Sequence, residues 1–319
     1  MRFRSATDSD IPAIVATFGD RNALPLEPRV LAALPGLLRQ LIASPAVVLN
    51  VFEEAGPGGL RVWSFAGGLF LRESVVDDYL AHPAPSFVGS VLGRLLDNQR
   101  PLLTLDEIRR ANTREGLELA VFPMPLGRFD WNGPEVNELR KLAPQAFVRH
   151  YGGYRLRAIY YEVFTDEVAS YLQSGGYRLL HDFSVRAGTG ILGPQCRPRM
   201  LRLTRAELPP GAMSMASQIF DPPAPRLGLS PAEQRVALRA LDGASDQSIA
   251  EELGLSPETV RSNWRGVYHR LAEVLPHIGT QERAGHAATR GLEKRRIAVD
   301  YLRQNLHELR PVERSPRAR

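Results

Sequence analysis

The sequence predicts two domains of different class, an α/β domain followed by an all-α domain. Strand-like and helix-like segments alternate over residues 1–208, which is typical of an α/β domain with a mixed sheet and helices. Residues 209–228 are rich in proline and glycine and have no sustained hydrophobic period, as expected of a linker. Residues 229–275 contain three helix-starting signals in close succession, and residues 276–319 predict a helical extension with a basic tail.

Composition limits the class of protein. A hydrophobic fraction of 44% and a charged fraction of 24% are ordinary for a globular protein. The chain has no apolar run long enough for a transmembrane helix, and its first residues contain no signal region, so we expect a cytoplasmic protein without a membrane partner. Cys196 is the single cysteine, which excludes an internal disulfide. The seven histidines do not cluster at metal-ligand spacing, so no metal site is predicted.

The elements of the first domain follow from hydrophobic period and turn signals. The helix over 8–18, for example, places Ile11, Ile14 and Phe18 on one face. A glycine-rich turn at 55–59 separates two strand-like segments as in a hairpin. Expected strands are 1–6, 46–54, 60–71, 116–124, 154–163 and 177–184; expected helices are 8–18, 27–43, 134–152 and 166–176, with a mostly helical stretch at 75–111.

The motifs "AT.SDIPAI" near the start and "YL.SGGYRLL.DF" near the end resemble the GNAT acetyltransferase fold over residues 1–184. That family holds the pyrophosphate of acetyl-CoA with backbone N–H groups of an Arg/Gln-x-x-Gly-x-Gly/Ala loop after its fourth strand. The corresponding segment here contains Gly127, Arg128 and Gly133 without this spacing, and "RHYGGY" places Tyr154 where a small residue is needed. We therefore predict a non-catalytic, GNAT-like sensor or dimerisation domain without a cofactor, with acetyl-CoA or acyl-CoA as the alternative.

Aromatic side chains of the first domain have two interpretations. They could line a ligand cavity, but a hydrophobic core is the commoner role for such residues. The residues concerned are Trp63, Phe65, Phe70, Phe129, Trp131, Tyr160 and Tyr161.

Positive charge gathers at the C-terminal end of the chain. From Gly254 onward the chain carries 13 arginine and lysine residues against 7 aspartate and glutamate residues, whereas the formal charge of the whole chain is +5. A basic segment attached to a neutral body favours a polyanionic partner, and a solvated tail is the alternative.

The first two helices of the second domain are marked by their ends. Ser230 is a predicted N-cap, Glu233 completes a capping box, and Gly243 ends the helix. The first helix is therefore expected to run from Pro231 to about Asp242. The second helix begins at Ser245 or Asp246 and ends at Gly254.

The third helix has a buried and an exposed face. Ser256 is its N-cap and Pro257 its first residue. The glycine-containing turn "LGLS" joins it to the second helix, which is the sequence form of a helix-turn-helix. Its apolar stripe is Val260, Trp264, Val267 and Leu271, with Trp264 expected in the core or at a dimer contact. The outward residues are Arg261, Ser262, Arg265 and His269.

Residues 229–271 resemble the LuxR-type DNA-binding domain of bacterial regulators. The matching residues are "LSP.E", Gly243, Ser245, "IA..L", "LS..TV", Arg261, Val267 and Arg270-Leu271. The resemblance implies that Arg261, Ser262 and Arg265 face the major groove and that Thr259 contacts a phosphate. Ala232 and Asn263 replace the usual Arg and His, and Gln247 lies near the usual Lys. The predicted DNA-binding residues are Gln247, Ser256, Thr259, Arg261, Ser262, Asn263, Arg265 and His269.

These resemblances predict a DNA-binding transcription regulator that acts as a homodimer on double-stranded operator DNA, in the cytoplasm and associated with the nucleoid. A small-molecule inducer is left unidentified, and RNA polymerase is a candidate second partner. The extension is expected to form one helix over 280–311, or two broken at Gly291, for dimerisation or packing. The alternatives are an acyl-CoA-dependent N-acyltransferase fused to a DNA-binding module, a helical bundle or interaction protein without DNA binding, and region 4 of a sigma factor.

Overall fold

The chain divides into two compact units in the computed structural model. The first unit comprises Met1–His150 with Arg155–Phe220, and the second comprises Tyr151–Tyr154 with Asp221–Arg319. Among the described residues, no helix combines the length and the apolar character needed to cross a membrane. The structure describes residues 1–18, 25–56, 59–124, 131–184, 197–208, 217–275 and 287–313.

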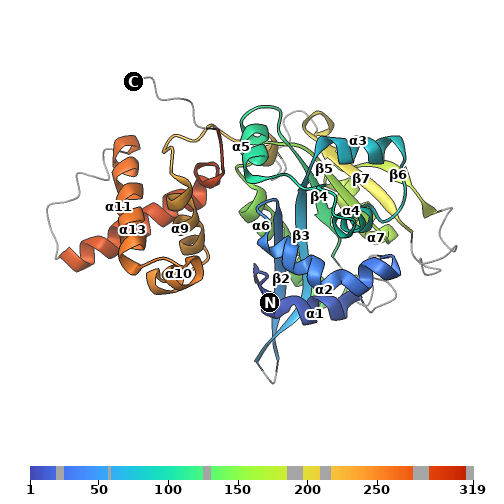
Figure 1. The fold of residues 1–319 in the computed structure, drawn as a ribbon, viewed down its shortest axis with the longest axis horizontal. Coiled ribbons are helices and arrows are strands. Elements are labelled where there is room, and N and C mark those ends of the chain that lie inside the picture. The colour runs from blue at the N-terminus through green and yellow to red at the C-terminus, as the bar shows by residue number, and fades with distance from the viewer. Residues whose placement is uncertain are drawn as a thin grey trace. The chain divides into compact units, whose positions relative to one another are not determined.

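One mixed sheet of seven strands forms the centre of the described part of the first unit (Figure 1). Its strands are β1 (Arg2–Ser5), β2 (Val47–Gly56), β3 (Gly59–Leu71), β4 (Leu117–Phe122), β5 (Leu156–Val163), β6 (Arg178–Asp182) and β7 (Arg199–Thr204). They lie in the order β1-β2-β3-β4-β5-β7-β6. β4 and β5 run parallel, whereas the other neighbours run antiparallel. This mixed sheet with helices is consistent with a GNAT-like fold.

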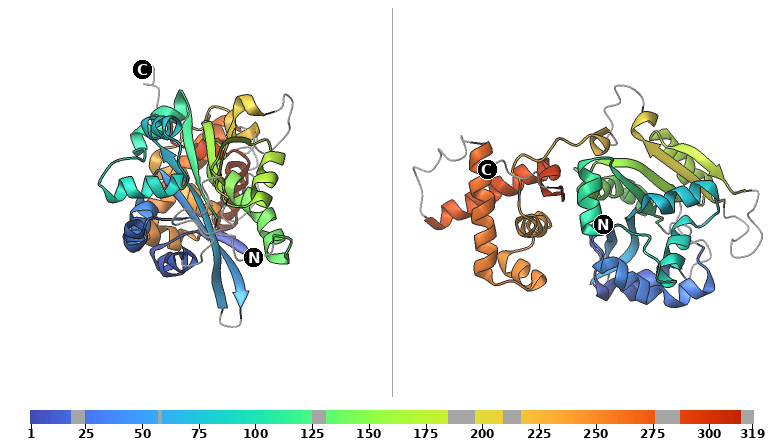
Figure 2. Two further views of the ribbon diagram at one scale, coloured as in Figure 1. Left: turned by 90° about the vertical axis from the view of Figure 1, so that its right-hand side faces the viewer. Right: turned by 45° about the horizontal axis from the view of Figure 1, so that its top comes forward.

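Helices cover both faces of the sheet (Figure 2). They are η1 (Asp8–Asp10), α1 (Ile11–Phe18), α2 (Pro28–Ala43), α3 (Glu73–Ala81), α4 (Phe87–Leu96), α5 (Leu105–Thr113), α6 (Pro134–Tyr151), α7 (Asp166–Ser174), η3 (Arg205–Glu207) and α8 (Ser217–Phe220). The largest core packs residues of α1 to α4 against alternate residues of the strands, among them Phe65 and Phe122. Residues of α6 and α7 pack on the opposite face, against Phe52 and Leu201 respectively. This alternation follows from the two-residue period of a strand.

The order of the central strands differs from the sequence-based expectation in one respect. Residues 199–204 form β7, which pairs with both β5 and β6 and so separates them. We expected no strand there. The segment is short, and Arg199 and Arg202 interrupt its apolar residues. Met200, Leu201 and Leu203 are buried on both faces of the sheet, and the pairing with two neighbours stabilises the strand.

The prediction that the aromatic residues of the first domain form core is confirmed for four of the seven. Trp63, Phe65, Phe70 and Tyr160 are buried. Trp131 and Tyr161 are partly exposed, and Phe129 lies outside the described residues. Part of the linker also packs, since Ile219 and Phe220 in α8 are buried. The linker residues 209–216, like Cys196, lie outside the described residues.

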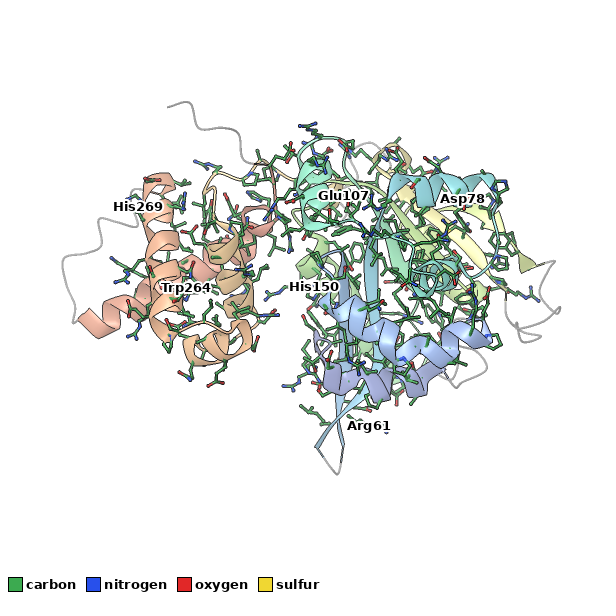
Figure 3. All side chains as sticks on the ribbon, viewed as in Figure 1. Arg61, Asp78, Glu107, His150, Trp264 and His269 are labelled. Carbon is green, nitrogen blue, oxygen red and sulfur yellow. The ribbon has the colours of Figure 1, made fainter. Side chains whose placement is uncertain are left out.

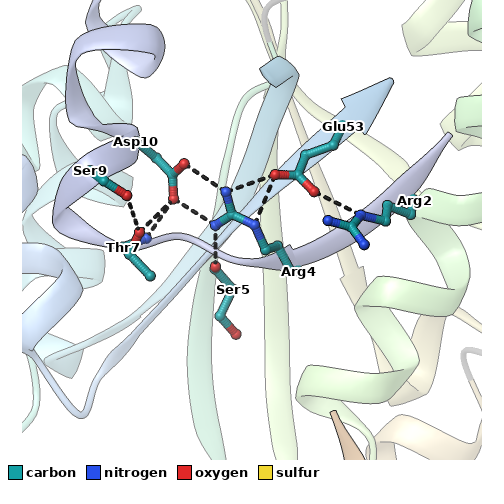
Figure 4. Close-up of polar contacts among 7 residues, drawn as sticks. All are labelled: Arg2, Arg4, Ser5, Thr7, Ser9, Asp10 and Glu53. Carbon is teal, nitrogen blue, oxygen red and sulfur yellow. Dashed lines mark hydrogen bonds and ion pairs between the residues drawn. The ribbon is translucent and has the colours of Figure 1, made fainter. Parts of the chain in front are cut away.

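An ion-pair network joins the first two elements of the chain to β2 (Figure 4). The guanidinium of Arg4 donates to Asp10 at 2.7 and 2.8 Å and to Glu53 at 2.9 Å. Asp10 also accepts from the Thr7 backbone nitrogen at 2.8 Å. Because Asp10 and Glu53 are buried, their charges depend on these partners.

The second unit is a helical bundle around one core. It contains α9 (Pro231–Leu241), α10 (Asp246–Leu253), α11 (Pro257–Val274), α13 (Ala287–Gln304) and η4 (Leu306–Leu309). Ser230 and Ser256 are the caps expected from sequence, and Ser245, one of the two expected starts, caps α10. Each accepts from the backbone nitrogen three residues later. Gly254 adopts a left-handed conformation at φ 62°, which lets the chain turn sharply between α10 and α11. Trp264 was expected either in the core or at a dimer contact, and it is buried in this core.

The C-terminal extension differs in part from its expected helix. α13 is continuous through Gly291 but ends at Gln304, and the chain then forms the short turn η4. Ala298 and Leu302 are fully buried in the core of the same unit. Within η4, the buried carboxylate of Glu308 accepts from the backbone nitrogens of Arg226 and Leu227 at 2.8 to 3.0 Å. Residues 276–286 and 314–319 lie outside the described residues.

Candidate functional site

The parallel strands β4 and β5 part at their carboxyl ends. Val121 and Tyr161 form the last pair in register between them. Beyond this pair, Phe122 pairs with Gly67 on β3, and Glu162 pairs with Met200 on β7. Ligands of α/β sheets bind outside the carboxyl ends of parallel strands, where the backbone is not used by a neighbour. This end of the sheet is therefore where a site is expected.

Glu162 places a carboxylate at this point of β5. Its side chain turns to the same face as Tyr160 and is only 1% exposed. The two carboxylate oxygens accept from the backbone nitrogens of Ser86 at 2.6 Å and Phe87 at 2.8 Å, at the start of α4. Burial raises the pKa of Glu162 to about 7, although these two hydrogen bonds oppose the rise. The carboxyl group can therefore gain or lose a proton near neutral pH.

Two further buried polar groups follow, Tyr79 close to Glu162 and His181 in contact with Tyr79. The hydroxyl of Tyr79 on α3 and the Nε2 of His181 on β6 are buried without a hydrogen-bond partner in the described chain. Their rings lie edge to face with centroids 6.1 Å apart, and the Tyr79 ring lies 4.2 Å from that of Phe87. Buried polar atoms without partners are uncommon in folded proteins and often mark binding or catalytic sites. We call Tyr79, Ser86, Phe87, Glu162 and His181 the Glu162 cluster.

The ionisation of these neighbours is shifted toward their neutral forms. Burial and the nearby Glu162 raise the pKa of Tyr79 well above its ordinary value. Burial lowers the pKa of His181. At neutral pH, Tyr79 therefore holds a proton to donate, and the imidazole of His181 is uncharged.

The turn that presents Ser86 to Glu162 is conformationally restricted. Ser86 has φ 67° and ψ 52°, a left-handed conformation that is uncommon for a residue with a side chain. Its hydroxyl donates to the Pro25 carbonyl at 2.5 Å. A Cβ atom on Gly89 would lie 2.1 Å from this hydroxyl, so the turn requires glycine there. These contacts hold the start of α4 against the end of β5.

The phosphate end of a bound acyl-CoA has less support among the described residues. Gly133 precedes α6, whose first residue, Pro134, has no N–H group, and whose first turn carries the acidic Glu135. The backbone nitrogen of Asn137 donates to the Gly133 carbonyl at 3.0 Å. This helix start does not suit an anion. Gly127 and Arg128 lie outside the described residues.

The second glycine segment, 149–154, is occupied by the chain itself. Arg310 donates to the Gly152 carbonyl at 2.8 Å, and its guanidinium lies 4.8 Å from the centre of the Tyr154 ring. A Cβ on Gly153 would lie 2.4 Å from the His307 backbone nitrogen. The glycine there accommodates a neighbouring backbone, which explains it without a phosphate.

The outer face of α11 contains most of the predicted DNA-binding residues. Arg261 and Arg265 have side chains 64% and 69% exposed, and Ser262 and His269 are also exposed. Figure 3 marks His269 and the inward-facing Trp264 on this helix. The face is therefore polar and basic, opposite the apolar stripe that fixes its orientation.

The remaining predicted residues have local roles. Ser256 and Thr259 form the helix cap, with their hydroxyl oxygens 2.8 Å apart. Asn263 donates to the Thr259 carbonyl at 2.8 Å. Gln247 lies on α10 and donates to Glu251 at 2.7 Å, so it does not belong to the α11 face.

Sequence reasoning missed two carboxylates of these candidate sites. Glu162 is a single carboxylate inside the apolar segment "AIYYEV", and that interruption of a buried strand was the available signal. Glu258 lies on the predicted DNA-binding face and contacts both arginines. Its position three and seven residues before them could have identified it. In the described part of the chain, no group of three or more His, Cys, Asp or Glu residues could hold a metal ion.

Comparison with known proteins gave similar solved structures only. No family model and no curated protein matches the chain. A spermidine N-acetyltransferase from Vibrio cholerae is 11% identical, with 65% of this chain and 96% of that chain covered and a TM-score of 0.37. Arabidopsis thaliana NAA60 in complex with acetyl-CoA is 12% identical, with coverages of 64% and 98% and a TM-score of 0.35. A ribosomal-protein-alanine N-acetyltransferase from Brucella melitensis is 17% identical, with coverages of 64% and 99% and a TM-score of 0.34.

Three of the solved structures that the chain resembles are N-acetyltransferases, so our prediction that the chain is not an enzyme is withdrawn. That prediction depended on an atypical pyrophosphate loop. Such a loop concerns how the phosphates of a cofactor are held and does not describe the residues that would act on the reacting groups. These structures are similar in fold to the N-terminal part of the chain.

Proposed function

We propose that the chain joins an acyl-CoA-dependent N-acyltransferase domain to a DNA-binding module. The observation that carries the enzymatic half is Glu162, a buried carboxyl with a pKa of about 7 at the carboxyl end of the parallel strand pair. A general base works best when its pKa lies near the working pH. Glu162 meets this requirement and is accompanied by two polar atoms that have no protein partner in the described chain.

The Glu162 cluster fits the reacting end of such a cofactor better than the described start of α6 fits its phosphates. A bound acyl-CoA would supply an acyl thioester as the activated donor. Glu162 would accept the proton from an acceptor ammonium, leaving the amine free to react. Tyr79 would keep its hydroxyl proton for donation, and His181 would accept a hydrogen bond in its uncharged form. These roles correspond to the ionisation states that burial gives the groups.

Release of free thiol from acetyl-CoA by the full chain tests this half. We expect saturable release that requires an added primary amine, such as a polyamine or a peptide with a free N-terminus. The variant Glu162→Gln should lose the amine-dependent release while keeping its helical circular dichroism. Binding of acetyl-CoA without transfer to any amine, or equal rates in the variant, would contradict the proposal.

The outer face of α11 supports the second half. An arginine pair on an exposed helix face, next to a capped N-terminus, matches the way recognition helices contact guanine edges and phosphates in the major groove. The module would read operator DNA as a homodimer and regulate transcription, with a nucleoid location following from that binding. RNA polymerase and an unidentified small-molecule inducer are further candidate partners of the chain.

Binding of a labelled duplex to the full chain, measured over a range of salt concentrations, tests the second half. Arg265→Ala should cost roughly 1–3 kcal/mol on a selected site if Arg265 is bidentate to guanine. If it contacts only phosphate, all sequences should weaken together and the salt slope should fall by about one. Arg296→Ala, which removes an arginine from α13 that is similarly exposed, is the matched control. Equal binding by both variants and the unmodified chain would reject the assignment of α11.

A further inference from the structure

Glu258 lies on the same face of α11 as the two arginines proposed to contact DNA. Its carboxylate is 2.7 Å from the guanidinium of Arg265 and 3.3 Å from that of Arg261. All three side chains are more than 60% exposed. Residues three and seven positions apart share one helix face, so the three groups form one surface, which we call the Glu258 triad.

We infer that Glu258 is a specificity-determining residue that restrains Arg261 and Arg265 and selects the base pairs they meet. This inference rests on the proposed DNA-binding function. It assigns the carboxylate a role in recognition that neither arginine can supply, because a carboxylate accepts hydrogen bonds and repels phosphate, whereas a guanidinium does the opposite.

The first consequence concerns DNA of any sequence. In the free protein, Glu258 offsets one of the two positive charges of the triad. Exposed ion pairs of this kind are weak, so a phosphate of the DNA can replace Glu258 as the partner of an arginine. The carboxylate nevertheless stays within reach of the same surface, and approach of a phosphate to it is unfavourable. Glu258 therefore weakens binding wherever the DNA offers only its backbone.

The second consequence concerns the selected sequence. In the major groove, a glutamate accepts from the exocyclic amine of cytosine, and arginine donates to the O6 and N7 of guanine. Because all three side chains lie along one face of α11, they would meet neighbouring base pairs. The triad therefore favours a site that presents a cytosine amine beside guanine. Thr259 does not compete for these contacts, since its hydroxyl is held by Ser256.

The variant Glu258→Gln tests this role, with Glu293→Gln as the matched control. Glu293 is an exposed carboxylate on α13 that pairs with Arg296, so the control makes the same charge change away from the triad. The full chain and both variants would be used to select sites from random duplexes. Affinities would then be measured for the selected site and for a mixed-sequence duplex without it, over a range of salt concentrations.

We expect Glu258→Gln to bind the mixed-sequence duplex several-fold more tightly, with a salt slope steeper by about one because one more cation is free for phosphate. Its preference for the selected site should fall by about tenfold, and cytosine should be lost at one selected position. The control should stay within twofold of the unmodified chain. If the chain binds DNA and Glu258→Gln changes neither the preference nor the selected bases, the inference is wrong while the proposed function stands. If neither the chain nor Glu258→Gln binds any duplex, the proposed DNA binding fails and the inference fails with it.

Discussion

The Oε1 atom of Glu162 lies 2.6 Å from the backbone nitrogen of Ser86, a residue 76 positions earlier in the chain. The contact joins the end of β5 to the start of α4, where free N–H groups favour a negative charge. Burial works against that charge and keeps the pKa near 7. Glu162 therefore both anchors a helix and holds an exchangeable proton.

The first prediction concerns the pH dependence of acyl transfer. The rate at subsaturating substrate should rise with pH through about 7, because Glu162 acts only after losing its proton. Glu162→Gln should lower the rate by about 10²–10⁴-fold and remove this rising limb. Glu167→Gln, an exposed carboxylate on α7, is the control and should keep the profile. A rising limb that persists in Glu162→Gln would assign the titration to another group.

A second prediction concerns the turn before α4. Gly89→Ala places a methyl group against the Ser86 hydroxyl and should lower the free energy of unfolding by about 1–3 kcal/mol through overpacking. Gly93→Ala lies in the same helix, and its methyl group meets only ordinary contacts at 3.5 Å or more. That control should be neutral or more stable by roughly 0.5–1 kcal/mol, since alanine favours helix. Denaturant unfolding of both variants measures the difference. Equal stabilities would mean that the Ser86 turn adapts without cost.

The ion-pair network in Figure 4 predicts sensitivity to acid. Burial raises the pKa of Asp10, but hydrogen bonds from Arg4 and Thr7 lower it by more, so it lies below its ordinary value. A depressed carboxyl pKa contributes stability above the unfolded-state value of about 3.9, and this is lost as pH falls through the folded-state value. Asp10→Asn should therefore lower the free energy of unfolding by about 1–3 kcal/mol at neutral pH and by little in strong acid.

Unfolding curves recorded across acidic and neutral pH would check that expectation. Asp106→Asn removes an exposed carboxylate that pairs with Arg109 and should change stability little at any pH. A constant difference between Asp10→Asn and the unmodified chain at all pH values would show that the charge of Asp10 is not the stabilising feature.

The last prediction concerns how α13 is held within the second unit. Arg295 donates to Asp246 at 2.6 Å and to the Ala244 carbonyl at 2.9 Å, and it lies 5.4 Å from the centre of the Trp264 ring. Arg295→Ala should destabilise this unit by about 1–3 kcal/mol, because a hydrogen-bonded, partly buried charge pair is broken. Arg296→Ala removes the next side chain, which is exposed, and should have little effect. Tryptophan fluorescence during denaturant unfolding would compare them. An equal loss of stability in both variants would mean that removing a positive charge from α13, and not the contacts of Arg295, lowers the stability.

The amino-acid sequence by itself determined the features that depend on near neighbours. The N-caps at Ser230, Ser245 and Ser256 bond to residues three positions later, so their spacing alone predicts where α9, α10 and α11 begin. The stripe of α11 likewise follows from helical period, which also indicates its outward residues. Strand period located β1 to β6 in the same way, because alternation of apolar residues is a local property.

Only the tertiary structure decided the contacts between distant segments. The place of β7 between β5 and β6 depends on pairing with both strands, and its short apolar pattern does not specify that pairing. The contact of Glu162 with Ser86 and the proximity of Tyr79 and His181 require the sheet order and the packing of α3 and α4. The contact of Glu308 with the backbone of Arg226 and Leu227 joins residues more than 80 positions apart. Such features depend on burial and on charge interactions between residues far apart in sequence, so the local hydrophobic period does not predict them.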